Sequence, residues 1–133
     1  MTIADRMTRC PHPHNAERGE DALAALTDLP AMLADLIRGT AGSSPYLAGL
    51  IKREAVWVVP AMADPEGAVA GVLADVRATE AVDLADNLRE AKRRIALITA
   101  LADLSGAWPL ARVTGTITDF SYAAVHQCIT KLV

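Results

Sequence analysis

The amino-acid sequence predicts an all-α fold, a helical bundle of about five helices that follows a flexible N-terminal leader. Aromatic residues make up only 4% of the 133 residues, and the strong helix formers Ala and Leu dominate. A β-sandwich would instead draw on Val, Ile, Thr and aromatic residues. Apolar residues also recur at three- and four-residue steps, the period of helices with one buried face.

Length and charge limit the number of domains and the classes of partner. We expect a single helical domain over residues 20–133, because a chain that is 52% hydrophobic can bury a real core at this length. The net charge of −3 gives the chain as a whole no phosphate-neutralising basic surface, so nucleic-acid binding is not expected.

A membrane span and a secreted location are also not expected. The most apolar run, residues 95–104, is ten residues long and contains Asp103, whereas a spanning helix needs about 20 apolar residues. Cys10 and Cys128 lie at opposite ends of the chain, and no secretory signal precedes them. We therefore predict two reduced thiols and a cytoplasmic location.

The leader, residues 1–19, is polar and shows no helical period, so we predict that it is mobile. It contains the sequence CPHPH, in which Cys10, His12 and His14 are possible metal ligands. Prolines separate these ligands and no second pair closes a tetrahedral site, so we predict no metal centre.

The first helix is expected from about Glu20 to Arg38, with Pro30 as a kink or break and with Gly39 and Gly42 ending it. The sequence SSPYL then predicts a second helix start. Ser44 can cap the free amides while Pro45 occupies the first helical position, where its missing N–H costs nothing.

Two short stretches follow. The run AVWVV at residues 55–59 has the composition of a strand, but an apolar helix or turn closed by Pro60 is favoured because no partner strand is evident. The sequence ADPEG predicts another helix start, with Asp64 as the cap and Glu66 in the first turn, leading to a helix through about Arg77.

The longest predicted helix covers residues 81–104, DNLREAKRRIALITALADL being its main part. One side of its first half should be exposed to solvent, with Glu90 paired to Arg94. Its second half should be enclosed by other helices. Asp103 would carry a carboxylate into the enclosed half and would need a partner there. We expect this partner to be Arg112 or another basic group, rather than a ligand.

A tight connection and a last helix follow. In SGAWPL, Gly106 suits a left-handed helix stop and Pro109 suits the next first turn. The last helix should begin at about Leu110 and bury one apolar face. The expected face comprises Leu110, Val113, Ile117, Phe120 and Ala124, continuing to Ile129 and Leu132.

The segments SSPYLAGLIKREAVWVV and NLREAKRRIALITALADLSGAWPLARVTGTITDF resemble the amino-terminal helical region of bifunctional glutamine synthetase adenylyltransferase/adenylyl-removing enzymes. The resemblance covers roughly residues 42–120. It implies the de-adenylylating half, which acts on the adenylylated tyrosine of glutamine synthetase. It further implies three partners: glutamine synthetase, a PII-type signal protein and the remainder of a larger nucleotidyltransferase polypeptide. In the family a Gly-rich loop and paired aspartates, outside this helical region, hold Mg²⁺ and the nucleotide.

No such loop or aspartate pair occurs in this sequence, so we expect the chain to be catalytically incomplete and to hold no cofactor by itself. Arg89, Lys92 and Arg93 are candidates to face phosphate or a nucleotide in the larger protein, and Asp103 is a further candidate binding residue. The main alternative is a free-standing helical interaction module without enzymatic activity. A small enzyme using His126 and Cys128 is least supported, because no orienting acid is evident.

Overall fold

A computed structural model describes residues 1–132, and within them it is helical with no strand, which confirms the all-α class. The described part has more helices than the five predicted. Its elements are α1 (Ile3–Arg6), α2 (Ala16–Ala24), α3 (Ala31–Ser43), α4 (Pro45–Arg53), α5 (Ala55–Ala63), α6 (Pro65–Ala78), the 3₁₀ helix η1 (Ala81–Asp83), α7 (Leu84–Leu104) and α8 (Leu110–Leu132).

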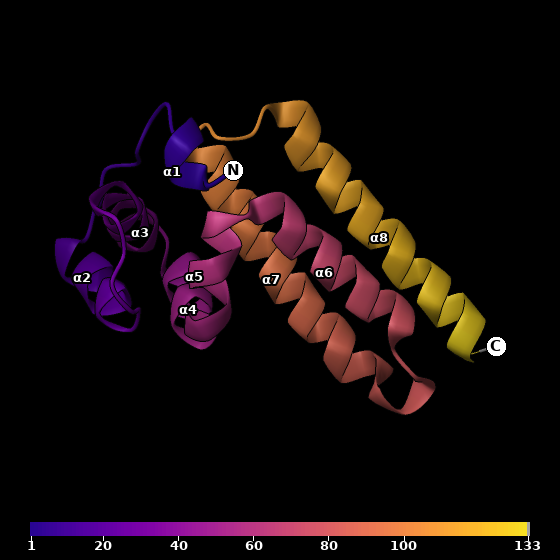
Figure 1. Cartoon of the computed structure of the whole chain (residues 1–133). Coiled ribbons are helices and arrows are strands. Elements are labelled where there is room, and N and C mark those ends of the chain that lie inside the picture. Colours follow the sequence, from indigo (N-terminus) through magenta and orange to yellow (C-terminus); the bar gives the residue numbers. More distant parts are fainter. Residues whose placement is uncertain (133) are drawn as a thin grey trace.

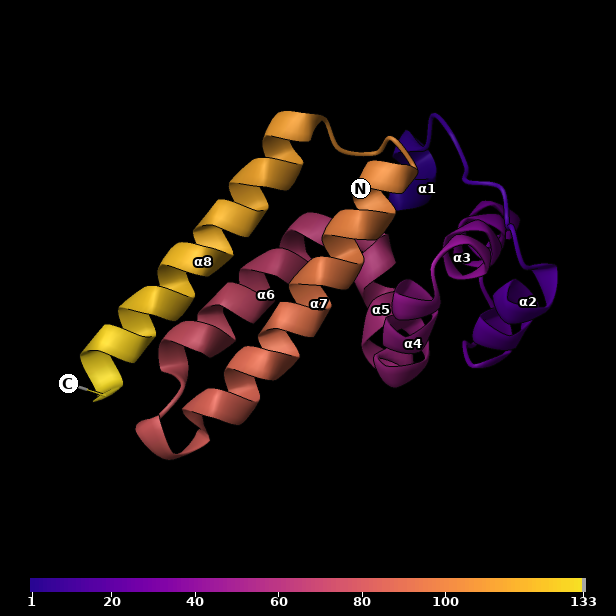
Figure 2. The same cartoon turned by 180° about the vertical axis from the view of Figure 1, so that it is seen from behind.

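The helices form two groups that share α7 (Figures 1 and 2). Helices α6, α7 and α8 are long and run side by side, while α1 to α5 gather around the C-terminal half of α7. The larger apolar core lies in the second group, and its fully buried members include Ile37, Ile51, Leu97 and Leu101. A smaller core of Val72, Val76, Ala91, Ile95 and Ala123 joins α6, α7 and α8.

The predicted mobile leader is wrong, because residues 1–19 are folded onto the rest of the chain. Thr2 and Asp5 form a capping box around α1, and the side chain of Ile3 is completely buried. Asn15 caps α2, its side chain accepting a hydrogen bond of 2.9 Å from the backbone N–H of Arg18. The leader is therefore part of the core and of the first helix pair.

Between these two helices, the CPHPH segment lies directly on α3. A Cβ atom on Gly39 would lie 1.9 Å from the carbonyl oxygen of Pro11, and one on Gly42 would lie 2.4 Å from Cβ of Pro13. The predicted helix end at these two glycines is wrong, since α3 continues through both to Ser43. Their lack of a side chain serves this close approach instead.

Of two proline predictions, one is confirmed and one is wrong. Pro30 was expected to kink or break the helix over residues 20–38, and the chain is broken there, because α2 ends at Ala24 and Pro30 occupies the N-cap position of α3. Pro60 was expected to close its element but lies inside α5, which runs to Ala63. Pro60 has no backbone N–H, so the carbonyl of Val56, four residues earlier, receives no helical hydrogen bond. Val56 is highly exposed, and water can replace the missing donor there.

The local helix signals are confirmed. Oγ of Ser44 accepts a 3.1 Å hydrogen bond from the N–H of Leu47, and Oδ1 of Asp64 accepts one of the same length from Gly67. Pro45 and Pro65 occupy first helical positions. Gly106 has a φ of 73°, the left-handed conformation expected at a helix stop.

Glu66 ties three distant parts of the chain together. Its carboxylate accepts two hydrogen bonds from the Arg6 guanidinium in α1, the longer being 2.9 Å, and one of 3.1 Å from Nε1 of Trp108 in the α7–α8 connection. The bonds from Arg6 lower the pKa of Glu66 from 4.5 to about 2, against partial desolvation and with help from Trp108.

We expect this cluster to make stability depend on acid pH. Because the folded pKa is depressed, the stabilisation is complete above pH 4.5 and is lost as the pH falls from about 4.5 to about 2. A third of the side chain is exposed, so the contribution should be only on the order of 1 kcal/mol. Urea unfolding across this range should show a smaller pH slope for Glu66→Gln than for the natural chain. An identical slope would contradict this assignment.

Candidate functional site

The basic segment of α7 makes a largely internal ion cluster. The side chain of Glu54, at the junction of α4 and α5, is only 6% exposed. Its two oxygens accept hydrogen bonds from Nε of Arg94 at 2.7 Å and from Nε of Arg93 at 3.2 Å. A buried carboxylate is stable only when it is paired and hydrogen-bonded, so these arginines are needed where they are.

Arg94 makes two further contacts. Its Nη1 lies 2.9 Å from Oε1 of Glu90, which confirms the predicted pair one turn apart, and its guanidinium lies 5.4 Å from the centre of the Trp57 ring. The cluster of Glu54, Arg93, Arg94, Glu90 and Trp57 joins the α4–α5 corner to α7. Sequence reasoning missed Glu54, because the pairing spans about 40 residues and leaves no local signal.

Arg89 and Lys92, the other two basic candidates, differ from Arg93. Both are exposed on α7. Arg89 makes one ion pair, of 2.9 Å, with Asp86 in the preceding turn, and Lys92 has no carboxylate within 4.0 Å among residues 1–132. These two side chains are therefore available to an anionic partner, whereas Arg93 is engaged with Glu54.

Asp103 is not enclosed, which corrects the prediction. Its side chain is 49% exposed, and its nearest cation is Arg9, whose Nη2 lies 3.8 Å away. The prediction named Arg112 or another basic group, and the second option is the one observed, because Arg112 lies over the Trp108 ring at 5.8 Å from the ring centre. The reason is tertiary: Arg9 lies in the leader segment, which folds against the end of α7. The structure thus separates Asp103 from the three basic candidates.

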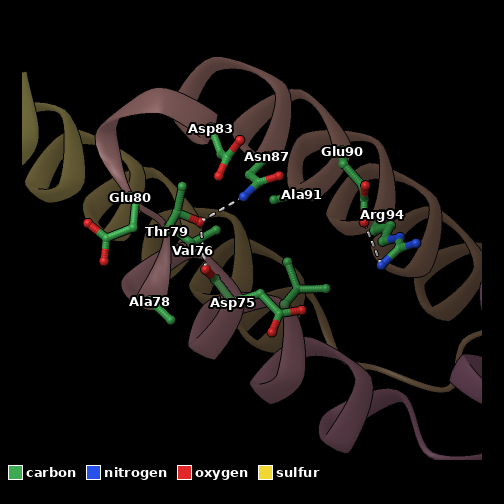
Figure 3. A pocket seen from close by; sticks show the side chains of 11 residues that line it. Asp75, Val76, Ala78, Thr79, Glu80, Asp83, Asn87, Glu90, Ala91 and Arg94 are labelled. Atoms are coloured by element: carbon green, nitrogen blue, oxygen red, sulfur yellow. Dashed lines mark hydrogen bonds and ion pairs between the residues drawn. The ribbon is translucent and has the colours of Figure 1, made fainter.

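A cavity of about 320 Å³ opens beside the Glu54 cluster, between the end of α6, η1 and the first half of α7 (Figure 3). Its apolar floor includes Val72, Val76 and Ala91. Four carboxylates line it, those of Asp75, Glu80, Asp83 and Glu90.

The polar interior of this cavity is already ordered. Nδ2 of Asn87 donates to Oγ1 of Thr79 at 3.3 Å, and this hydroxyl donates to the carbonyl of Asp75 at 2.7 Å (Figure 3). Arg94, the one cation among the lining residues, is paired with Glu54 and Glu90. The excess of carboxylates makes the cavity unsuited to a phosphate group, so a nucleotide would have to bind elsewhere.

The two remaining candidates from the sequence, His126 and Cys128, lie on α8. His126 is exposed and stacks on Tyr122, with ring centres 6.2 Å apart, while Cys128 is half-buried. Among residues 1–132, no three His, Cys, Asp or Glu side chains are grouped as a metal site requires. In the same part of the chain, every helix is too short or too polar to cross a bilayer.

Helix α8 exposes several large apolar side chains on one side. The predicted core face of this helix is confirmed for Val113 and Phe120, which are partly buried against the cores. It is wrong for four large members, Leu110, Ile117, Ile129 and Leu132, which are exposed. With Tyr122 and Val125 these four form the outer face of α8, each side chain being 47–74% exposed. The inner side packs Val113 and Phe120 against the two cores and also buries Thr116, Ala123 and Gln127. Nε2 of Gln127 donates to the carbonyl of Thr79 at 3.1 Å.

The chain is similar to several proteins named bifunctional glutamine synthetase adenylyltransferase/adenylyl-removing enzyme. The Caulobacter vibrioides protein is 33% identical over 143 residues, covering 98% of this chain and 14% of the relative. The Bradyrhizobium sp. ORS 278 protein is 34% identical, covering 98% and 15%. The Xanthobacter autotrophicus protein is 32% identical, covering 88% and 12%.

The similarity therefore runs through nearly the whole chain but only a small part of each relative. No family model matches the chain. No solved structure matches it either. The match over 98% of the residues nevertheless confirms the resemblance carried by the SSPYL segment and the last helix pair. The chain is a relative of one segment of the bifunctional glutamine synthetase adenylyltransferase/adenylyl-removing enzyme family.

Proposed function

We propose that this chain serves the regulation of glutamine synthetase, as an N-terminal helical segment that supports the removal of adenylyl groups by a catalytic domain supplied elsewhere. The observation that carries this proposal is the similarity to the Caulobacter enzyme over 98% of the chain. On this proposal the chain is catalytically incomplete alone. Mg²⁺ and the nucleotide bind to the remainder of the enzyme, and glutamine synthetase and a PII-type signal protein are its partners.

The internal ion clusters support a scaffolding role. The Glu54 cluster holds the α4–α5 corner against α7, and Glu66 holds α1 against α6 and Trp108. Contacts of this kind fix the relative positions of helices, which a segment needs if it is to position a neighbouring domain.

A segment exchange in the Caulobacter enzyme tests the proposal. The matched 14% of that enzyme is replaced by this chain, and adenylyl removal is measured on adenylylated glutamine synthetase. We expect the chimera to retain activity within about tenfold of the parent, because a homologous scaffold should preserve the positions of the catalytic groups. This chain alone should be inactive. A soluble, folded chimera without activity would refute the supporting role.

The same chimera tests the basic residues. We propose that Arg89 and Lys92 face a phosphate or nucleotide, since both are exposed, and that Arg93 contributes through its pairing with Glu54. The double variant Arg89→Glu/Lys92→Glu should weaken nucleotide affinity about tenfold or more. Arg53→Glu/Arg77→Glu, at exposed positions on α4 and α6, is the matched control and should leave it unchanged. If both double variants bound the nucleotide with equal affinity, Arg89 and Lys92 would not contact its phosphate.

The alternative function is a free-standing helical interaction module, and the apolar outer face of α8 is the observation that favours it. Genomic sequence separates the two functions. A reading frame that continues into a Gly-rich loop and spaced aspartates supports the enzyme segment, whereas a stop codon after Val133 supports the module.

A further inference from the structure

We propose that the outer face of α8 binds the same face of a second copy of this chain, forming a symmetric dimer of two antiparallel α8 helices. The proposal goes beyond the role in glutamine synthetase control and does not depend on it. Its starting point is the distribution of side chains on α8, where six large apolar residues are exposed while only two, Val113 and Phe120, pack against the cores. A helix in this arrangement places most of its apolar surface away from its own chain.

The outer face is also free of charge. The charged residues of α8 are Arg112, Asp119 and Lys131, and at 3.6 residues per turn each lies roughly 120–140° around the helix from Val125. An exposed helix of 23 residues normally carries charged side chains along its solvent side. An uncharged side about 34 Å long is instead typical of a surface that another protein covers.

The area of this face suits a second copy. Six large side chains exposed to this degree present on the order of 700 Å² per copy, close to the roughly 800 Å² per partner of a stable protein interface. Two copies would therefore bury on the order of 1,400 Å² without any contribution from other elements.

The helix dipoles favour the antiparallel over the parallel arrangement, because opposed dipoles attract each other. In an antiparallel pair with full overlap, the two-fold axis passes at the helix midpoint, Ser121. Each of the three charged residues then lies level with an uncharged one.

The same overlap pairs the apolar residues. With the axis at Ser121, Leu110 lies level with Leu132 of the second copy, and Ile117 lies level with its Val125. The small side chain of Ser121 occupies the crossing point, where two helices approach most closely. Opposed helix dipoles add a small stabilisation.

Sedimentation equilibrium of the purified chain tests the proposal. We expect a concentration-dependent dimer of twice the chain mass of 14.1 kDa, populated at about 100 µM. Val125→Asp should weaken dimerisation about a hundredfold or more, because it buries an unpaired carboxylate. The matched control is Val56→Asp, which changes an equally apolar and 91% exposed residue outside α8 and should leave dimerisation unchanged.

Circular dichroism of each variant shows that the helices remain folded, so a loss of dimer is not confused with unfolding. A natural chain that stays monomeric up to about 1 mM would overturn the proposal, since even weak specific interfaces associate there. A dimer that persists in Val125→Asp would overturn it too, because the interface would then lie on another surface. A monomer that binds only a different helical protein would have the same consequence.

Cysteine cross-linking determines the direction of the pair. In a Cys10→Ser/Cys128→Ser background, Ser121→Cys should form an intermolecular disulfide under mild oxidation, whereas Leu110→Cys should not. A parallel pair would cross-link at both positions, and a disulfide at position 110 would therefore exclude the antiparallel arrangement. Absence of a disulfide at position 121 would exclude the axis at the helix midpoint.

Discussion

Replacing Glu54 by Ala should lower the free energy of unfolding by about 3 kcal/mol, since removing one member of a buried ion pair leaves its partners uncompensated. Two guanidinium groups lose their shared carboxylate in this variant, Arg93 and Arg94, and both are largely buried against it. The α4–α5 corner also loses its polar attachment to α7. The change is measured by urea unfolding monitored by far-ultraviolet circular dichroism.

Glu20→Ala is the matched control for this experiment. Glu20 pairs with Arg38 at 2.7 Å, a shorter contact than the one between Glu54 and Arg93, but both members of this pair are well exposed. Exposed pairs contribute about 0–1 kcal/mol, so the control should change stability little. If both variants lost the same small amount, water would be replacing Glu54 around the arginines, and the cluster would not be a structural anchor.

Gly39→Ala should destabilise the chain by about 1–3 kcal/mol, although alanine is the better helix former. The new Cβ would lie 1.9 Å from the carbonyl oxygen of Pro11, and that atom belongs to the backbone, which cannot rotate away as a side chain can. The CPHPH segment must therefore move off α3. Hydrogen exchange of residues 8–14 and urea unfolding measure the two consequences.

Gly49→Ala makes the same chemical change in α4, where nothing lies within 4 Å of the added atom. This control should stabilise the chain by about 0.5–1 kcal/mol through helix propensity alone. The two substitutions are thus expected to have opposite signs. A stabilising Gly39→Ala would mean that the leader is not held against α3 in solution.

The candidate site was predictable in part. The cluster of basic residues on α7 is visible in the letters REAKRR, and the ion pair of Glu90 with Arg94 follows from their spacing. The different environments of Arg89 and Arg93 were not predictable, because Arg93 is held by Glu54, about 40 residues earlier. Asp103 was predicted to pair with Arg112 or another basic group, and that this group is Arg9 was not predictable, since Arg9 comes from a segment that showed no helical period.

The sequence by itself determined the helical class, the resemblance to the adenylyltransferase family and the local helix boundaries at Ser44, Asp64 and Gly106. These features depend on composition or on residues within one turn of each other, so they can be deduced from neighbours along the chain. Only the tertiary structure decided that the first 19 residues pack on α3 and that α8 turns its larger apolar side outward. Both depend on which surfaces meet, and a periodic pattern shows that a helix has an apolar side without showing what covers it.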